Sequence, residues 1–292
     1  MITIITPTYN RAYIIEKAYE SLCQQTDWRF EWIVVDDGST DETETLVKQW
    51  IGRTNRFSIR YVKQKNGGKH RAVNKGVALA AYEYILILDS DDYLTCDACE
   101  KIHRWIGTIE GLSGFAGVAG LKGWSNREGI IGLKNKKEFI DATNLERTRY
   151  KLTGDKAEVY KTELMRQYPF PEFEGENFIR ESVVWDKIAQ EGYKIRWFNE
   201  VIYKGEYLED GLTKNVDYKV HVRNFNGYIY ATKLYLETHI LPYRILRIGH
   251  CYAVVREKNL SIEDMCSLLG IGKIGAYFAV WICTIKNRLQ GR

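Results

Sequence analysis

The chain has 292 residues, enough for one large α/β domain with an appendage, or for two domains with a sizeable core. Hydrophobic residues make up 45% of it, an ordinary share for a globular protein. The formal net charge is only +4, which argues against a dedicated nucleic-acid-binding protein, so we expect no nucleic-acid partner.

The first part of the chain alternates apolar runs with helical patterns. Strands are predicted at residues 2–5, 32–35, 57–62 and 84–88, with helices at about 12–23, 43–50 and 69–81. This β-α-β-α-β-α-β order predicts a parallel sheet with helices on both faces. Apolar runs without alternation agree with strands that are buried on both faces.

The pattern loosens after about residue 111. Strands are predicted at 115–122, 158–160, 195–198 and 201–203, helices at 162–167 and 178–190, and a loop-rich excursion at 123–149. From residue 217 the pattern is helical almost to the end. We therefore expect a domain over residues 1–215, with halves 1–110 and 111–215, and a helical extension over 216–292.

Six cysteines are scattered along the chain, and one pair, Cys96 and Cys99, forms a Cys-x-x-Cys. No second pair completes a zinc site, so we interpret these two cysteines as incidental. The N-terminus runs directly into a strand pattern, without the basic segment and apolar core of a signal peptide. A reducing cytoplasm is therefore the expected location.

Polar clusters follow the first, second and fourth predicted strands. In parallel sheets, ligands bind outside the carboxyl ends of the strands, so we expect the clusters at one edge. A tyrosine there offers a flat face for a base, threonine and asparagine offer hydrogen bonds, and a carboxylate can accept from a uracil N–H or a ribose hydroxyl. The clusters are Thr6-Pro7-Thr8-Tyr9-Asn10, Asp36-Asp37-Gly38-Ser39 and Asp89-Ser90-Asp91-Asp92.

The run from Asp89 to Asp92 holds three carboxylates, which repel one another unless a cation lies among them. Mg²⁺ and Mn²⁺ take oxygen ligands and often keep nucleotide phosphates as further ligands. The run therefore predicts a metal site for a phosphorylated ligand. The alternative, for this run and for the one after Asp36, is an acidic turn that caps the next helix.

Two glycine-rich segments resemble phosphate-binding loops. Asn66-Gly67-Gly68-Lys69-His70 is not a Walker A loop, but its backbone N–H groups and Lys69 can meet a diphosphate. The alternative is an ordinary Asn-Gly turn. The Gly-x-Gly-x-x-Gly at residues 270–275 is rejected as a dinucleotide fingerprint, because it follows a helical segment and too little chain remains for a βαβ unit.

A second acidic region precedes the helix predicted at 178–190. Glu181 lies at the start of that helix, near Trp185. A buried carboxyl at the sheet edge has a raised pKa, which suits a general base. The alternative is a favourable interaction between the carboxylate and the helix N-terminus.

Taken together, residues 4–11, 32–41 and 88–94 resemble the GT-A glycosyltransferases of family 2. The resemblance is strong over about residues 1–110 and weaker to about residue 215. It implies a Rossmann-like GT-A sheet and an inverting, single-displacement transfer from a nucleotide-diphosphate-sugar. It makes residues 1–110 the nucleotide-binding half and 111–215 the acceptor half of the catalytic domain.

The resemblance also implies roles for single residues. The family often places a Glu-Asp pair at the helix that carries the base; here the pair is Glu181-Ser182, and Glu181 is assigned as the base. The nucleotide sugar would be held by Thr6, Tyr9, Asp37, Lys69 and Asp89, and Mn²⁺ or Mg²⁺ by Asp91, with Asp92 as a substitute ligand.

A nearly continuous apolar stretch, Ile274 to Ile285, lies near the C-terminus and is flanked by Lys273, Lys286 and Arg288. It is shorter than the roughly 20 residues of a transmembrane helix. Apolar bulk with basic flanks suits an interfacial helix on an anionic membrane surface. The alternatives are a helix packed on the catalytic domain, a homodimer contact and a membrane span.

We therefore predict a metal-dependent, inverting glycosyltransferase that moves a sugar from a UDP-sugar to a hydroxyl of a glycan or lipid-linked acceptor. It would serve cell-surface polysaccharide synthesis in the cytoplasm, peripheral to the inner membrane face. Because Ser182 replaces the family's Asp, a catalytically impaired sugar-nucleotide-binding relative is one alternative. A sugar nucleotidyltransferase is another, although the glycine- and arginine-rich loop after the first strand is missing. A receiver-like signalling module is disfavoured by the length of the chain.

Overall fold

The computed structural model describes residues 1–53, 56–211 and 218–289, with side chains up to residue 286, so the side chain of Arg288 lies outside it. Contacts divide the chain into two compact units. Unit 1 contains residues 1–170 and 187–206, and unit 2 contains residues 171–186 and 207–292. The contacts thus join residues 171–186 to the C-terminal helices, while the domain boundary at residue 215 stays a prediction.

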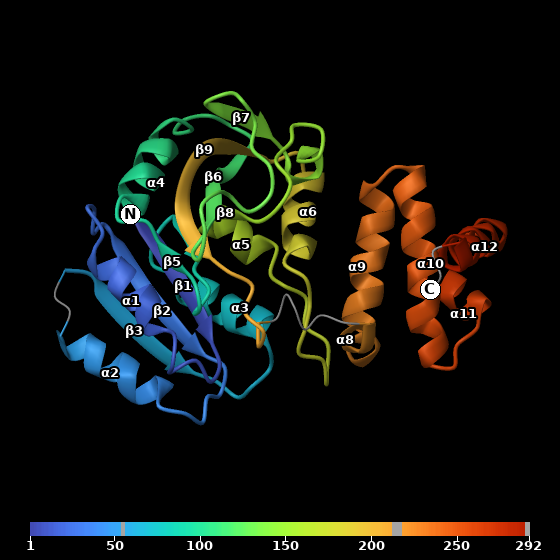
Figure 1. The fold of residues 1–292 in the computed structure, drawn as a ribbon, viewed down its shortest axis with the longest axis horizontal. Coiled ribbons are helices and arrows are strands. Elements are labelled where there is room, and N and C mark those ends of the chain that lie inside the picture. Colours follow the sequence, from blue (N-terminus) through green and yellow to red (C-terminus); the bar gives the residue numbers. More distant parts are fainter. Residues whose placement is uncertain (54–55, 212–217, 290–292) are drawn as a thin grey trace. The chain divides into compact units, whose positions relative to one another are not determined.

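Unit 1 is built around one sheet (Figure 1). Its strands are β1 (Ile2–Thr8), β2 (Phe30–Asp36), β3 (Ser58–Lys63), β4 (Tyr84–Ile87), β5 (Tyr93–Leu94), β6 (Phe115–Trp124), β7 (Phe139–Ala142), β8 (Lys156–Lys161) and β9 (Lys194–Gly205). The strand order is β3-β2-β1-β4-β8-β6-β9-β5, and β7 also pairs with β9. Strands β1 to β4 are parallel, as predicted.

The second half of the sheet departs from the sequence prediction. Strand β8 is antiparallel to both β4 and β6, so the sheet as a whole is mixed. The strands predicted at 195–198 and 201–203 are one strand, β9, because a register shift against β6 absorbs the irregular residues between Trp197 and Val201. Strand β7 lies within the excursion predicted to be loop-rich.

Helices cover both faces of the sheet in unit 1 (Figure 1). They are α1 (Glu16–Cys23), α2 (Thr43–Arg53), α3 (Lys69–Leu79), α4 (Ala98–Gly107) and α5 (Thr162–Gln167), with a 3₁₀ turn, η1 (Asn144–Glu146). Successive side chains of β1 pack on opposite faces of the sheet. Ile4 belongs to a core cluster with Trp32 and with Trp105 of α4. Ile5 faces α3, where a Cβ on Gly76 would lie 2.5 Å from its Cγ2. The predicted fold class is confirmed.

Unit 2 is helical. It contains α8 (Tyr218–Arg223), α9 (Phe225–Thr238), α10 (Leu241–Glu257), α11 (Ile262–Leu269) and α12 (Lys273–Leu289), and α6 (Ser182–Gln190) crosses the division between the units. Its core includes Ile229, Val255 and Met265. Helices α10 and α12 approach closely at Gly249, where a Cβ would lie 2.1 Å from Cys283 Sγ.

The segment before α6 is hydrogen-bonded to the N-terminus of α9. Glu176 accepts hydrogen bonds from the N–H groups of Asn226 (2.7 Å) and Gly227 (2.8 Å). Asn224 Oδ1 accepts from the N–H groups of Asn177 (2.8 Å) and Phe178 (2.9 Å). The helix predicted to begin at Phe178 begins at Ser182 instead, and the residues before it are bonded to Asn224 and to the start of α9.

The glycine motif at residues 270–275 is a helix connection. Ser261 and Asp264 form a capping box at the start of α11. Gly270 ends α11 in the left-handed region, with φ of 69°, where glycine is favoured. The rejection of this motif as a dinucleotide fingerprint agrees with its place between α11 and α12.

Lys156 in β8 gives a testable dependence of stability on pH. It is 3% exposed, and its Nζ donates to Thr153 O at 2.9 Å. Burial and the nearby Arg147 charge lower the pKa of Lys156 to about 8 from 10.5. Between these values the unfolded chain binds more protons, so stability rises with pH from about 8 to 10.5, by up to about 3 kcal/mol.

In Lys156→Met we expect this rise to disappear. The free energy of unfolding in urea, measured for both proteins at several pH values between 7 and 10.5, tests it. Taking the difference between the two proteins removes the contributions of other titrating groups. Parallel pH curves for the wild type and the variant would contradict the prediction.

Candidate active site

The loops after β1 and β2 are fastened to each other at the carboxyl edge of the sheet. The N–H of Asn10 donates to Ser39 Oγ at 2.8 Å, and the N–H of Thr40 donates to Asn10 Oδ1 at 2.8 Å. Asn10 has a φ of 52°, a left-handed conformation that asparagine adopts more readily than most residues. Two of the predicted polar clusters are thus brought together.

Asp37 fastens a third segment to this edge. It is 4% exposed, and its carboxylate accepts from Gln64 Nε2 (2.8 Å) and from the N–H groups of Gly67 (2.9 Å) and Gly68 (2.7 Å). These bonds shape the loop that leads into α3. Since Oδ2 accepts only one of them, it has room for a further donor from a ligand. The base-binding role of Asp37 stays a prediction.

Lys69, at the start of α3, joins this loop to the acidic run after β4. Its Nζ lies 2.5 Å from Asp89 Oδ1. Burial acts to raise the pKa of the Asp89 carboxyl, but the cations of Lys69 and Lys122 hold it below its ordinary value. The predicted lysine and the first predicted aspartate therefore form one charged pair at the strand tip.

The other two aspartates have different surroundings. Asp91 is half-buried, and loss of hydration together with the Asp89 charge raises its pKa. Asp92 is 8% exposed. Burial raises its pKa to about 7, because the repulsion from Asp89 and Asp91 adds to this effect and the attraction of Lys122 only partly offsets it. Asp91 is thus the more accessible carboxylate of the two.

Two residues that the sequence prediction missed support this run. Tyr203 of β9 is fully buried, and its hydroxyl accepts from the N–H of Asp89 at 2.9 Å and is hydrogen-bonded to the Asp92 carboxyl. Lys122 of β6 places its Nζ 4.0 Å from the centre of the Tyr203 ring. Neither residue belongs to a motif. The pairing of β9 with β5 and with β6 brings them to the acidic run.

The aspartates of the acidic run fit a divalent cation that is also coordinated by oxygen atoms of a bound substrate. Among the described residues, no three carboxylate, histidine or cysteine side chains are grouped to hold a metal alone. Mg²⁺ is commonly bound by one or two carboxylates plus substrate phosphates, so such a group is not required. The raised pKa of Asp91 marks a carboxylate whose charge a cation would stabilise.

The other predicted site residues, Tyr9, Thr6 and Glu181, differ in exposure and in their contacts. Tyr9 is 48% exposed, so its ring is accessible for stacking. Thr6 is fully buried, and its hydroxyl accepts from Trp32 Nε1 at 2.8 Å. Its side chain therefore serves the core, and any contact of Thr6 with a ligand stays a prediction. Glu181 belongs to unit 2, and its carbonyl accepts from the N–H of Val184 at 3.0 Å, which places it at the N-terminus of α6.

Gly205 at the end of β9 gives a test of the acidic run. A Cβ there would lie 2.2 Å from Asp92 Oδ1 and 2.7 Å from its Cγ. Gly205→Ala should therefore displace the buried carboxylate and destabilise the protein by about 1–3 kcal/mol, as overpacking does.

The free energy of unfolding measures this effect. Gly52→Ala in α2 is the matched control, because a Cβ there meets nothing within 4 Å. It should leave stability unchanged or raise it. If Gly205→Ala is as stable as the control, the prediction is wrong, because the Asp92 side chain then moves aside without a cost in stability.

The fold and this edge define a class of protein: an α/β protein with acids, a lysine and an accessible tyrosine gathered at the carboxyl ends of parallel strands, where such sheets bind phosphorylated ligands. The family model described as Glycosyl transferase family 2 matches residues 3–161. The chain belongs to this family.

Individual proteins of similar sequence or fold are also glycosyltransferases by name or bind a nucleotide sugar in their solved structures. The chain is 36% identical over 101 residues to the putative teichuronic acid biosynthesis glycosyltransferase TuaG of Bacillus subtilis, covering 35% of this chain and 40% of TuaG. Its fold is similar to S. aureus TarS in complex with UDP-GlcNAc, at 21% identity, TM-score 0.64, 91% of this chain and 75% of that one. It is also similar to the mannosyltransferase PcManGT of Pyrobaculum calidifontis with GDP-Man and Mn²⁺, at 19% identity, TM-score 0.56, 97% of this chain and 75% of that one.

Proposed function

We propose that this chain is an inverting glycosyltransferase that moves a sugar from a UDP-sugar to a hydroxyl of a glycan or lipid-linked acceptor in cell-surface polysaccharide synthesis. The observation that carries the proposal is the Lys69–Asp89 pair, which stands with Asp91 at a strand tip of a family 2 chain. The UDP-GlcNAc complex of TarS supports the donor class, and the name of TuaG supports the type of product.

In this proposal the UDP-sugar lies across the carboxyl ends of the parallel strands in unit 1. The uracil ring stacks on Tyr9, its N–H donates a hydrogen bond to Asp37, and Asp89 binds the ribose. Lys69 brings a positive charge toward the diphosphate. Asp91, with Asp92 as the alternative, holds Mn²⁺ or Mg²⁺. The PcManGT complex with Mn²⁺ supports this choice of ion.

Glu181 acts on the acceptor. It takes the proton of the acceptor hydroxyl as that oxygen attacks the anomeric carbon from the face opposite the diphosphate. The bond between the anomeric carbon and the diphosphate oxygen breaks in the same step, so the configuration inverts. When bound, the metal ion supplies positive charge for the departing diphosphate.

Release of nucleoside diphosphate tests the proposal. The protein is mixed with Mn²⁺ and a panel of nucleotide sugars, and binding and hydrolysis are measured. UDP-sugars should bind in preference to GDP-sugars and hydrolyse slowly. If no donor binds to folded protein, the proposal fails. Ser182, in place of the family's Asp, favours one alternative, a relative that binds the donor without transfer, and that outcome would appear as binding with no turnover.

A peripheral position on the inner membrane face is part of the proposal, and α12 supports it. Ile274 is 90% exposed, Phe278 51% and Trp281 59%, and they recur at helical spacing, while Ala279 on the same helix is fully buried. Lys273 and Lys286 flank this face. An exposed aromatic face beside lysines suits an anionic lipid surface. In the described part of the chain, no single helix is long and apolar enough to span a bilayer; α11 and α12 together meet that criterion but are bent by 118°.

Flotation with vesicles containing phosphatidylglycerol tests this position. The wild type should float with the vesicles, and Phe278→Ser with Trp281→Ser should weaken binding by about tenfold or more. Ile51→Ser, which removes a 42% exposed apolar side chain from α2, is the control. Equal flotation of all three proteins, or a concentration-dependent dimer that the double variant abolishes, would contradict the proposal.

A further inference from the structure

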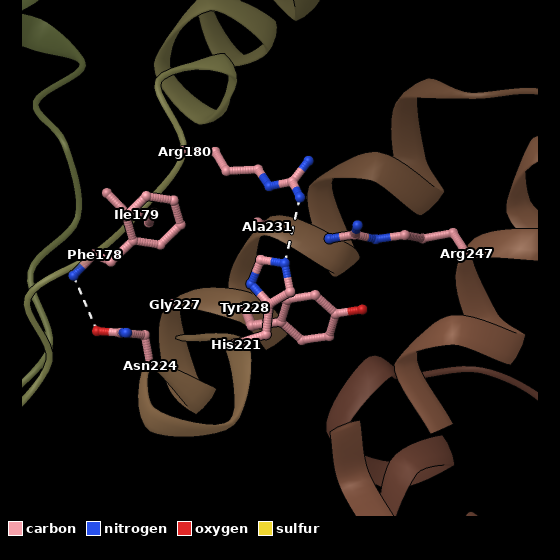
Figure 2. A pocket seen from close by; sticks show the side chains of 9 residues that line it. All are labelled: Phe178, Ile179, Arg180, His221, Asn224, Gly227, Tyr228, Ala231 and Arg247. Atoms are coloured by element: carbon pink, nitrogen blue, oxygen red, sulfur yellow. Dashed lines mark hydrogen bonds between the residues drawn. The ribbon is translucent and has the colours of Figure 1, made fainter. Parts of the chain in front are cut away.

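A pocket in unit 2 has no role in the proposed donor site. It is lined by residues of the segment before α6 and of α8, α9 and α10. Figure 2 shows the guanidinium groups of Arg180 and Arg247 extending toward one another, with the rings of His221 and Tyr228 below them. The pocket therefore gathers cationic and aromatic side chains from four segments.

In the part of the chain that the structure describes, neither arginine forms an ion pair with a carboxylate. Arg180 Nη2 lies 3.3 Å from His221 Nε2. Arg247 donates through Nε to Thr232 Oγ1 at 3.1 Å, and its guanidinium lies 4.7 Å from the centre of the Tyr228 ring. Most of the N–H groups of both guanidiniums are thus available to a ligand.

Arg180 is exposed at the mouth of the pocket, and the nearby charge of Arg247 disfavours its own charge. Loss of hydration and the charge of Arg247 lower the pKa of Arg180. Two like charges that converge without a counter-ion are stabilised when a negative group binds between them. Guanidinium groups match phosphate oxygens in geometry and can bind them through paired hydrogen bonds.

The pocket is held in shape by buried residues. Tyr228 is 7% exposed and Asn224 3%. Asn224 binds the N–H of Phe178 and, through Nδ2, Val220 O at 2.8 Å, so it ties the segment that carries Arg180 to α8. Because the backbone on both sides is fixed, a ligand would meet a largely preformed site.

We propose that this pocket binds a phosphate group, and that the group belongs to a phosphorylated acceptor. The second part rests on the proposed function. Arg180 directly precedes Glu181, the assigned base, and both belong to unit 2. A base must reach the acceptor hydroxyl, so the acceptor must come to Glu181, whose Cα lies about 3.8 Å from that of Arg180 along the chain. The donor diphosphate has its own cation in unit 1, Lys69.

Inorganic phosphate is the probe for the first part. Isothermal titration of the full chain should show binding that weakens by about tenfold in Arg180→Gln and in Arg247→Gln. Arg256→Gln, an exposed arginine of the same helix as Arg247, is the matched control and should bind like the wild type. Absence of binding to the wild type, or equal binding by all four proteins, overturns the phosphate site whether or not the chain transfers a sugar.

A second titration separates acceptor from donor. UDP affinity, measured with Mn²⁺, should be the same in Arg247→Gln as in the wild type. A loss of UDP affinity as large as the loss of phosphate affinity would assign the pocket to the donor and overturn the acceptor assignment. With an active acceptor, Arg247→Gln should raise the acceptor KM by about tenfold and leave the donor KM unchanged.

Discussion

Replacing Glu181 by Gln is expected to lower the turnover number for sugar transfer by about 10²- to 10⁴-fold, the range that a positioned general base contributes. The amide keeps the size and shape of the side chain but cannot take the acceptor proton. Since the proposed donor contacts, Tyr9, Lys69 and Asp89, belong to unit 1, the affinity for a UDP-sugar should stay within about twofold. Steady-state kinetics and a donor titration measure the two quantities.

Glu174→Gln is the matched control for this prediction. Glu174 is an exposed carboxylate of the same segment and should tolerate the change without loss of turnover. Full activity of Glu181→Gln would remove this residue from its role. A loss of donor affinity with normal turnover would make Glu181 a binding residue instead.

Replacing Asp91 by Asn is expected to lower kcat/KM by about 10³-fold, equivalent to about 4 kcal/mol of transition-state stabilisation. The reason is that a neutral amide binds a hard cation far less well than a carboxylate does. Titration of Mn²⁺ in the presence of UDP should show weaker binding of the metal ion, which gives a result independent of turnover.

Asp92→Asn is the comparison for Asp91→Asn. Asp92 is buried and hydrogen-bonded to Tyr203, and its pKa of about 7 leaves it partly protonated at neutral pH. An amide of the same shape should therefore change kcat/KM by about tenfold or less. If Asp92→Asn weakens Mn²⁺ binding more than Asp91→Asn does, Asp92 is the metal ligand. Melting temperatures of both variants show whether the fold is kept.

The parallel half of the sheet was predictable because its signals are local. Residues 2–5, 32–35 and 84–88 are apolar runs that end in polar loops, and β1, β2 and β4 occupy these positions. The antiparallel insertion of β8 was not predictable, since strand order depends on contacts between distant segments. At Gly117, a Cβ would lie 1.8 Å from Val159 O, a close approach that no local pattern announces.

The candidate site was predictable in part for the same reason. Asp37 and Asp89 stand in loops after strands and Lys69 at the start of α3, at positions that follow from strand order, and the structure brings them to one edge. Thr6 was predicted to follow the first strand, but it lies within β1, and its hydroxyl accepts from Trp32 of the neighbouring strand. Tyr203 and Lys122 carry no motif at all.

The sequence by itself determined the family, the parallel strands and the acidic, lysine and tyrosine side chains at their tips, because local hydrophobic patterns and short motifs specify these. Only the tertiary structure decided which of these groups are paired. It paired Lys69 with Asp89 and bonded Tyr203 to the acidic run, and it placed Arg180 and Arg247 in one pocket, where neither pairs with a carboxylate among the described residues. Such pairings depend on strand register and helix packing, which join residues far apart in the chain.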